Sequence, residues 1–402
     1  MAQSTSPLQV LPSPEDIRRL LRSKVLTAIH EVLEEELEAI LGSGWYERAQ
    51  GRRGYRHGSE QRRVTTEVGP VVLEVPRGRV LQADGTTAEV HSTILPRYQR
   101  RTQRVNDALL GAYLAGANTR RIRKALEPLL GEANLSKSSI SRVVQRVKSA
   151  FGGWSERRLE GECFALLYLD AIHLKVRMVR RVVSVPVLVA LGVREDGQKE
   201  LVALRIAASE SRAAWEALID DLSARGLPAP VAVASDGHAG LKRAIALWPD
   251  AKVQRCTVHK LENLLKHCPR HARAEVKRDY YRIIHAKDGE AAEEARQAFL
   301  RKWRPLCAEV ARSLEEAGTQ LLTFFAFPKE MHKSIRTSNA IENLNREFRR
   351  RTKTQGSFST EEAAVSLLWG LVAFGQIKMR KIDGHEHVAA MLARATENEQ
   401  AA

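Results

Sequence analysis

Three carboxylates lie where an acid can do chemistry. Asp170 follows the apolar run 164–169, which is typical of a strand buried on both faces, and a buried acid is costly unless it is paired or metal-bound. Asp236 follows a second apolar run, at the end of a predicted strand where α/β sheets usually place ligands. Glu342 lies one turn inside a predicted helix. If the three converge, they form an oxygen-only site for a hard divalent cation.

Such a site suits the cleavage of a phosphodiester, because two cations about 4 Å apart activate the attacking oxygen and stabilise the leaving one. Each acid also has a structural alternative. Asp170 could pair with the basic residue five or seven positions later, and Asp236 could open a turn with the glycine that follows it. Glu342 and Asn339 have the spacing of a capping box. The occurrence of all three acids in this strand order favours the common site.

The predicted helix that carries Glu342 is also basic. Its apolar residues form one face that fits packing on a sheet. Three arginines follow the acid at +4, +7 and +8 on another face, namely Arg346, Arg349 and Arg350. A catalytic acid beside arginines suits a substrate with a phosphate backbone. The alternative is a surface salt bridge between Glu342 and Arg346.

Cysteine and histidine gather after the last predicted strand. Cys256 and His259 have a Cys-x-x-His spacing that zinc sites use, and His267, Cys268 and His271 follow. Because His267 and Cys268 are adjacent and a helical stretch separates the two halves, packing at the end of that strand is the preferred interpretation. The sequence has neither a phosphate-loop motif nor His-Glu-x-x-His, so ATP hydrolysis and zinc peptidase chemistry lack a motif.

The composition points to a polyanionic partner. The 402 residues include 64 Lys and Arg against 48 Asp and Glu, a net charge of +16, so nucleic acid is the first candidate and a merely soluble basic enzyme the alternative. A hydrophobic fraction of 44% excludes wholesale disorder. No apolar stretch approaches the roughly 20 residues of a membrane helix, no secretory signal is recognisable, and four cysteines make no disulfide framework. We therefore predict a cytoplasmic protein associated with chromosomal DNA.

The N-terminal part is predicted to hold the DNA. Residues 1–45 predict an amphipathic helix for packing or dimerisation, and residues 46–100 a basic segment with short strands that contacts DNA. Residues 101–152 predict short helices with tight turns, which fit a helix-turn-helix-like DNA-binding domain, although many helical bundles have the same pattern. Its basic residues include three candidate DNA contacts, Arg120, Arg121 and Arg142.

The C-terminal part must position the acids. Residues 160–259 predict three strands, a helix, a strand, a helix and a fifth strand at 253–258, which together make a mixed α/β sheet. Residues 260–333 lose strand character and predict an all-helical insertion. Residues 334–380 return to the sheet domain with two helices, and residues 381–402 predict a polar tail. The predicted fold class is therefore α/β, preceded by mainly helical regions.

At these motifs the sequence resembles the Mutator-type transposases of bacterial insertion sequences, over about residues 48–374. The matching motifs are Leu167-Tyr168-Leu169-Asp170-Ala171-Ile172, Ser235-Asp236-Gly237-His238, Cys256-Thr257-Val258-His259, Thr337-Ser338-Asn339-Ala340-Ile341-Glu342 and, seven positions later, Arg349. Tyr55-Arg56-His57-Gly58 and Val75-Pro76-Arg77 add to the likeness. His57 and Ser338 differ from the residues expected beside these motifs, but neither difference affects the three acids.

The resemblance implies a ribonuclease-H-like core whose DDE triad, Asp170, Asp236 and Glu342, binds two Mg²⁺ or Mn²⁺ ions, with the helical insertion between the second and third acids. It implies a DNA transposase that binds terminal inverted repeats, cleaves DNA strands hydrolytically and transfers the freed 3′-hydroxyl to target DNA. We expect it to act as a homodimer or higher oligomer. The alternatives are a non-catalytic DNA-binding regulator derived from a transposase, against which the three retained acids argue, and a ribonuclease-H-like nuclease that cuts without joining.

Overall fold

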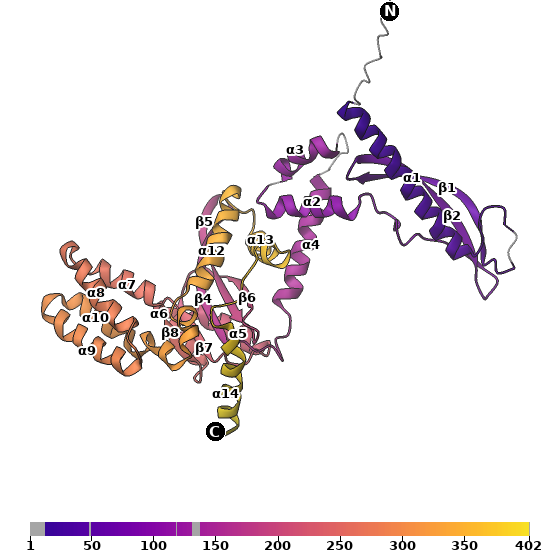
Figure 1. Ribbon diagram of the computed structural model, residues 1–402. Coiled ribbons are helices and arrows are strands. Elements are labelled where there is room, and N and C mark those ends of the chain that lie inside the picture. Colours follow the sequence, from indigo (N-terminus) through magenta and orange to yellow (C-terminus); the bar gives the residue numbers. More distant parts are fainter. Residues whose placement is uncertain (1–12, 48–49, 118, 131–136, 402) are drawn as a thin grey trace, which may run out of the picture. The chain divides into compact units, whose positions relative to one another are not determined.

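The computed structural model describes residues 13–47, 50–117, 119–130 and 137–401 (Figure 1). The chain divides into two compact units, Met1–Val144 and Gln145–Ala402, and each is described by itself. The division falls within helix α4 (Lys137–Ser155). Among the helices of the described residues, none is long and apolar enough to cross a membrane.

The first unit begins with helix α1 (Pro14–Leu41), as the sequence predicts. A capping box starts it, in which the Ser13 hydroxyl accepts a hydrogen bond from the Asp16 N–H, and Gly42 ends it with a φ of 72°. Leu33 and Leu37 are buried in the second half of the helix, which packs on the sheet that follows. Ile17, Leu20 and Leu21 near the start of the helix are exposed, so only part of the apolar stripe serves packing within this unit.

Helix α1 packs on a three-stranded antiparallel sheet. Its strands are β1 (Gly54–Thr66), β2 (Gly69–Leu81) and β3 (Thr87–Glu89), paired in that order. The hairpin of β1 and β2 turns between Thr66 and Gly69, which pair with each other. Both strands are longer than the apolar pattern predicts, because the exposed basic stretch of β1 continues the same backbone ladder without apolar side chains.

Three helices complete this unit, as the sequence predicts for residues 101–152. They are α2 (Gln103–Leu114), α3 (Thr119–Leu130) and the first part of α4. Val105, Leu109 and Ile122 form their common core with residues from the start of α4. The residues between α3 and α4 lie outside the described part of the chain.

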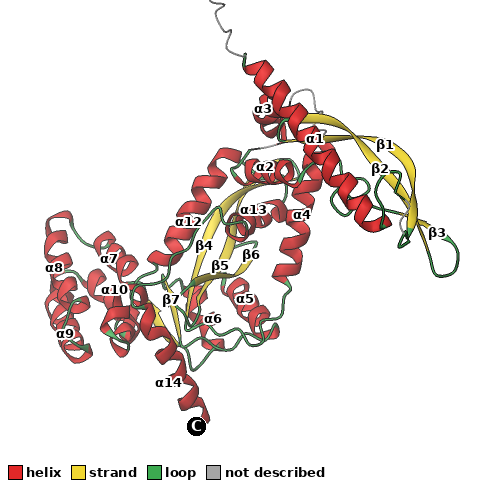
Figure 2. Cartoon of the chain, turned by 45° about the vertical axis from the view of Figure 1, so that its right-hand side comes forward, coloured by secondary structure: helices red, strands yellow, loops and turns green. Residues whose placement is uncertain are grey.

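The second unit is built on a five-stranded mixed sheet, which confirms the predicted α/β class (Figure 2). Its strands are β4 (Leu166–Met178), β5 (Arg181–Val193), β6 (Lys199–Ile206), β7 (Ala232–Ser235) and β8 (Lys252–Arg255). The spatial order is β6-β5-β4-β7-β8, with β4, β5 and β6 antiparallel and β4, β7 and β8 parallel. The two parallel connections run through helix α5 (Arg212–Ala224) and the short helix α6 (Ala239–Ala244).

Side-chain alternation along β4 gives the sheet two buried faces. Leu167 and Leu169 belong to one core together with Trp215 and Ile219 of α5. The next residue, Asp170, points to the other face, where it meets helix α12 (Asn339–Thr352). Helix α13 (Glu361–Ala373) also packs against β4 and β6. The first acid therefore lies between β4 and α12.

Between β8 and α12 the chain is helical, as predicted for the insertion. The helices are α7 (Thr257–Lys266), α8 (Arg273–Ile284), α9 (Gly289–Leu306), α10 (Ala308–Ala317) and the short α11 (His332–Ile335). Tyr280, Trp303 and Leu314 are among the buried residues of their own core. The predicted fifth strand at 253–258 is wrong at its end, because β8 stops at Arg255 and Thr257 already begins α7.

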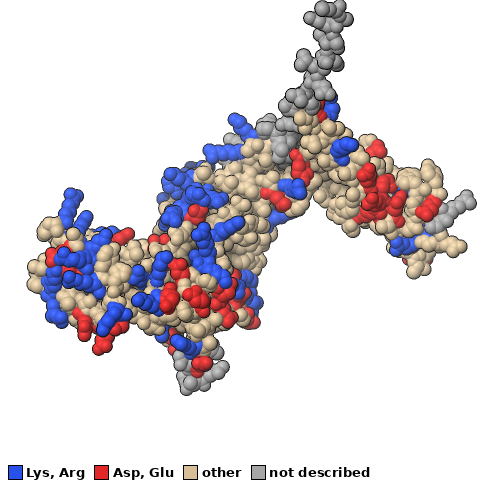
Figure 3. Space-filling model, viewed as in Figure 1, with Lys and Arg blue, Asp and Glu red and all other residues tan. Residues whose placement is uncertain are grey.

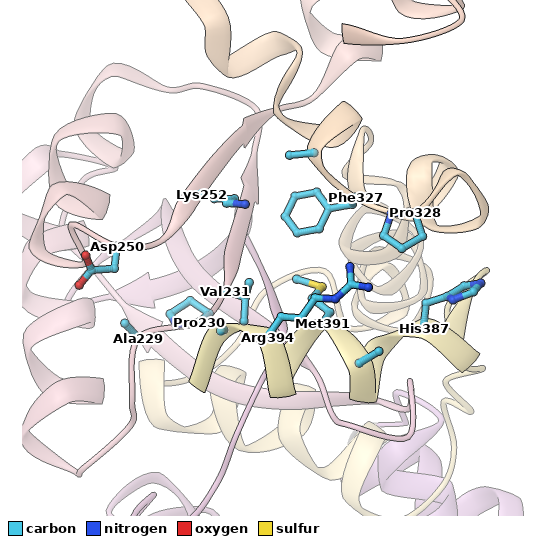
Figure 4. A pocket seen from close by; sticks show the side chains of 13 residues that line it. Ala229, Pro230, Val231, Asp250, Lys252, Phe327, Pro328, His387, Met391 and Arg394 are labelled. Carbon is cyan, nitrogen blue, oxygen red and sulfur yellow. The ribbon is translucent and has the colours of Figure 1, made fainter. Parts of the chain in front are cut away.

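The C-terminal segment, predicted as a polar tail, ends in helix α14 (Val388–Ala401), which buries Val388 and Met391. The segment is polar overall, but these two apolar residues are enough to anchor it. A cavity of about 470 Å³ lies beside the helix. Met391 and Arg394 extend into it from α14, opposite Phe327 and Lys252 (Figure 4).

Candidate active site

The register of the parallel strands brings the predicted residues to one edge of the sheet. Leu169 of β4 pairs with Ser235 of β7, and Ser235 pairs with Arg255 of β8. The residues after these pairs are Asp170, which lies inside the longer strand β4, and Asp236 and Cys256, which follow the last residues of β7 and β8 at the carboxyl edge of the parallel strands. This is the edge where α/β sheets place ligands.

The Asp170 carboxylate is held by two hydrogen bonds. It accepts one from the Ala171 N–H (2.8 Å) and one from the Asn345 side-chain amide of α12 (2.7 Å). Burial, with a further contribution from the negative charge of Asp236, nevertheless raises the pKa of Asp170 to about 6, against the lowering effect of both hydrogen bonds. The raised pKa of Asp170 thus reflects burial and a second carboxylate close by. Neither Lys175 nor Arg177 forms the predicted alternative ion pair within the described residues.

Asp236 lies on a turn that allows no side chain at the next position. Its Oδ1 accepts a hydrogen bond from the His238 N–H (2.8 Å), so the predicted turn does form. Gly237 has a φ of 84°, and a Cβ there would overlap the guanidinium of Arg255. That guanidinium is buried and is fixed by an ion pair with Glu316 (2.6 Å). The insertion therefore supports the loop of the second acid.

Glu342 lies in the first turn of α12, half-exposed, and accepts a hydrogen bond from the Ser338 hydroxyl. Ser338 is the N-cap residue, so the predicted capping box from Asn339 is wrong: Asn339 already lies inside the helix. The Glu342 Oε1 atom is 3.7 Å from the His259 Nδ1 atom. Glu342 thus faces the ends of β7 and β8 rather than serving only its own helix.

Cys256 and His259 join Glu342 in one cluster. The ligand atoms of the three side chains all lie within 4.8 Å of one another. The hydrogen bond with Cys256 raises the pKa of His259 to about 9 despite burial, and the charges of Glu342 and Asp236 contribute. Burial alone would raise the pKa of the Cys256 thiol, but hydrogen bonds with His259 and Ser338 lower it. A positive imidazolium therefore stands beside the acids.

The second half of the cysteine–histidine pattern lies elsewhere. His267 follows the last residue of α7, whereas Cys256 precedes the first. The ten residues of this helix span about 15 Å at 1.5 Å per residue. Within the described residues, His267, Cys268 and His271 therefore do not join the Cys256 cluster. Cys256 is only 1% exposed at the junction of β8 and α7, which fits the predicted packing role.

Family comparison adds an independent finding. The family model for "Transposase, Mutator family" matches residues 5–376. This chain belongs to the Mutator family of transposases. It is 36% identical over 363 residues to the transposase for insertion sequence element ISRM5 of Rhizobium meliloti (strain 1021), which covers 90% of this chain and 88% of that protein. It is 33% identical over 363 residues to the transposase for insertion sequence element IS905 of Lactococcus lactis subsp. lactis (strain IL1403), over 90% of both chains.

A third relative is the transposase for insertion sequence element IS1081 of Mycobacterium tuberculosis (strain ATCC 25618 / H37Rv), 33% identical over 355 residues, with 88% of this chain and 84% of that protein covered. These matches confirm the resemblance that the sequence motifs show. In this Mutator-family chain, the first acid lies within β4, the second follows the adjacent parallel strand β7, and the motif of the third opens the helix that packs on β4.

The arginines of α12 differ in their contacts. Arg346 donates to the Asn343 side chain (2.7 Å) rather than forming the predicted alternative salt bridge with Glu342, and Arg350 pairs with Glu347 (2.6 Å). Arg349 forms no ion pair within the described residues. Lys and Arg side chains gather over the region of α12 on the visible face (Figure 3).

The three predicted DNA contacts of the first unit lie on its helices. Arg121 is exposed on α3 and Arg142 on α4. Arg120 also belongs to α3, but its side chain lies outside the described part of the structure.

Sequence reasoning missed Asn345 and Ser338, which orient the first and third acids. Asn345 is 1% exposed, and its side-chain oxygen is buried without a hydrogen-bond partner among the described residues. A signal was present: asparagine is a poor helix former, and this one lies three residues after Glu342, on the same side of the helix. Only its contact with Asp170, 175 residues away, gives that position a meaning.

We predict that Gly237→Ala lowers the melting temperature and impairs metal-dependent activity, because the new Cβ strains the backbone and displaces Arg255. The expected cost is about 1–3 kcal/mol, or several degrees by calorimetry. Gly161→Ala is the matched control, since Gly161 has a φ of 81° but nothing within 4 Å of a built Cβ. Equal shifts in the two variants would show that Arg255 does not constrain the loop.

Proposed function

We propose that this Mutator-family protein is a DDE-type DNA transposase. It binds the terminal inverted repeats of an insertion sequence, cleaves DNA in a metal-dependent reaction and transfers the freed 3′-hydroxyl to target DNA. The observation that carries the proposal is the placement of Asp170 within β4 next to Asp236 at the end of β7, under the helix of Glu342, with Asn345 joining that helix to Asp170.

The proposed core is ribonuclease-H-like. Three antiparallel strands are extended by two parallel ones, with helices on both faces, and the helical insertion falls between the second and third acids. This arrangement supports what the motifs imply, because α12 returns to β4 only after the insertion is complete.

The residues at the strand ends fit two Mg²⁺ or Mn²⁺ ions. Asp170, Asp236 and Glu342 supply carboxylate oxygens, the ligands of hard cations. The pKa of Asp170, raised by burial and by Asp236, and the Asn345 oxygen, which has no hydrogen-bond partner among the described residues, support a cation site here. When bound, the ions would supply Lewis acidity and lower the pKa of an attacking water. The chain itself orients Asp170 through Asn345.

A zinc ion held by Cys256, His259 and Glu342 is the second arrangement that the geometry allows. We favour the oxygen-ligand site because a zinc-binding imidazole must be neutral, whereas the pKa of His259 is raised to about 9. In our proposal, His259 supplies positive charge beside Glu342 and Asp236, and Cys256 holds the imidazole in place.

DNA is the proposed partner of both units. Arg346, Arg349 and Arg350 extend from the helix of the third acid, where they can meet phosphates that flank the scissile one. The helix-turn-helix-like helices of the first unit, with Arg120, Arg121 and Arg142, are the proposed reader of the inverted repeats. We propose a homodimer or higher oligomer that acts on chromosomal DNA in the cytoplasm.

One assay distinguishes a transposase from two other possible functions. The purified protein is given Mg²⁺ and DNA that carries the ends of its element. A regulator binds only, a ribonuclease-H-like nuclease cuts without joining, and a transposase also joins strands. The paired carboxylates favour a catalytic protein. A buried acid pair without a cation lowers the free energy of unfolding, and a metal-binding role would account for its presence.

We predict that Asp170→Asn, Asp236→Asn and Glu342→Gln each abolish strand cleavage and leave DNA binding intact. Each change removes a ligand charge and keeps the size, and the three losses do not add, because the ligands act as one unit. Asp170→Asn also raises the melting temperature without metal, since it relieves a buried charge. Asp220→Asn on the exposed face of α5 is the control and remains active. Near-normal strand transfer by any triad variant in Mg²⁺ would remove that residue from the triad.

We predict that metal affinity rises with pH because Asp170 must lose its proton to bind. Its pKa is raised from 3.8 to about 6, so below about pH 6 the metal-free protein favours the protonated form, and the stability that this group contributes is lost as pH rises through about 4 to 6. Calorimetric Mn²⁺ affinity should increase between about pH 5 and pH 7 with release of a proton. Asp170→Asn should bind weakly and without this dependence. A flat profile in the unaltered protein would contradict the assignment.

We predict that sequence reading resides in the first unit. A fragment of residues 1–155, which ends after α4, should bind inverted-repeat DNA at least tenfold more tightly than scrambled DNA. The comparison is a competition gel shift at one fixed salt concentration. Equal affinity for both duplexes would place sequence reading elsewhere in the chain.

A further inference from the structure

A small basic pocket lies beside the far end of the catalytic helix. Its volume is about 240 Å³, and its lining includes His173 and Lys175 of β4, Arg349 of α12 and Lys353, which follows that helix. Leu174 and Phe358 add apolar lining. Four basic side chains thus meet from two elements that are far apart in sequence.

The backbone builds this pocket firmly. After α12 the chain returns to the edge of β4, where the Phe358 N–H donates to the Lys175 carbonyl (2.8 Å) and the Arg177 N–H donates to the Phe358 carbonyl (2.8 Å). Phe358 is 4% exposed and anchors this return. Lys353 is therefore brought to Lys175 by a strand-like pairing rather than by chance contact on a flexible surface.

The pocket carries uncompensated positive charge. Within the described residues, none of its four basic side chains forms an ion pair with a carboxylate, although the neighbouring Arg350 does. Attraction to the carboxyl-terminal end of α12 accounts for Arg349 and Lys353. It does not account for His173 and Lys175, which belong to a strand. Three cations, Lys175, Arg349 and Lys353, line one small pocket, so a bound anion would reduce the repulsion between them.

We propose that this pocket binds a phosphodiester of the DNA strand that passes the three acids. The inference rests on the proposed function and assigns a second contact point to it. His173 lies three residues beyond Asp170, about 10 Å along a strand, and Arg349 lies seven residues beyond Glu342, about 10 Å along a helix. A duplex whose axis follows this strand–helix pair, at about 3.4 Å of axis per nucleotide, would place the bound phosphate about three nucleotides from the scissile one.

The first test measures the salt dependence of DNA binding in the full chain. Lys175→Ala with Lys353→Ala should lower the slope of log K against log salt by up to about two units, equally for element-end and scrambled duplexes of 30 base pairs. Arg301→Ala with Lys329→Ala is the charge-matched control, since both side chains are exposed and form no ion pair in the described part of the chain. A slope no lower than that of this control would overturn the proposal.

The second test locates the phosphate. A single neutral methylphosphonate is moved along the cleaved strand, position by position, from the cut site. The unaltered protein should lose about tenfold in affinity near the third nucleotide, whereas the Lys175→Ala, Lys353→Ala variant should lose nothing more there. Equal losses for both proteins at every position would overturn the assignment.

Adding inorganic phosphate tests whether the pocket binds a free anion or a phosphate of DNA. If millimolar phosphate raises the melting temperature of the unaltered protein, and the double variant loses that effect while keeping its duplex salt slope, the pocket holds a free anion and the DNA proposal fails. Cleavage of element ends by the unaltered protein is scored in parallel. Its absence would count against the transposase function, whereas an unchanged salt slope with normal cleavage counts against the pocket alone.

Discussion

The parallel pairing of β7 with β4 and β8 is the constraint on which the rest of the site depends. It places Asp170, Asp236 and Cys256 one after another along a single edge, because each is the first residue after a paired one. A shift of one residue in the register of β4 would point the Asp170 side chain into the core where Leu169 packs. The apolar faces of the sheet therefore fix the register, and the register fixes the chemistry.

This arrangement of buried carboxylates is electrostatically unfavourable unless a cation is bound to it. Burial and Asp236 both raise the pKa of Asp170, and one amide from Asn345 compensates only in part. The imidazolium of His259 stands on the opposite side, next to Glu342. Such a cluster of buried charges does not stabilise the fold, so the packing of the surrounding residues must keep it rigid.

The helical insertion supplies part of that rigidity. It holds Arg255 through Glu316, and Arg255 in turn leaves room for nothing but glycine at 237. The insertion also delays the return of the chain, so that α12 can cross β4 with Glu342 at one end and Arg349 at the other. The acids and the basic pocket are thus two ends of one strand–helix pair.

The sequence by itself determined the elements whose pattern is local. Apolar runs and turn residues predicted short strands in the first unit, the succession of strands and helices along the second, and one acid on a buried strand with another at the end of a later strand. The sequence pattern extended strand β8 beyond its true end, where helix α7 begins, and it predicted only a polar tail where helix α14 forms. In both places a few buried apolar residues are enough to anchor a helix, and such a small number leaves a weak pattern in the sequence. The role of Asn345 was decided by tertiary structure alone, since its hydrogen bond spans 175 residues. The gathering of Lys175 and Lys353 was likewise invisible, because no local pattern records which surfaces folding brings together.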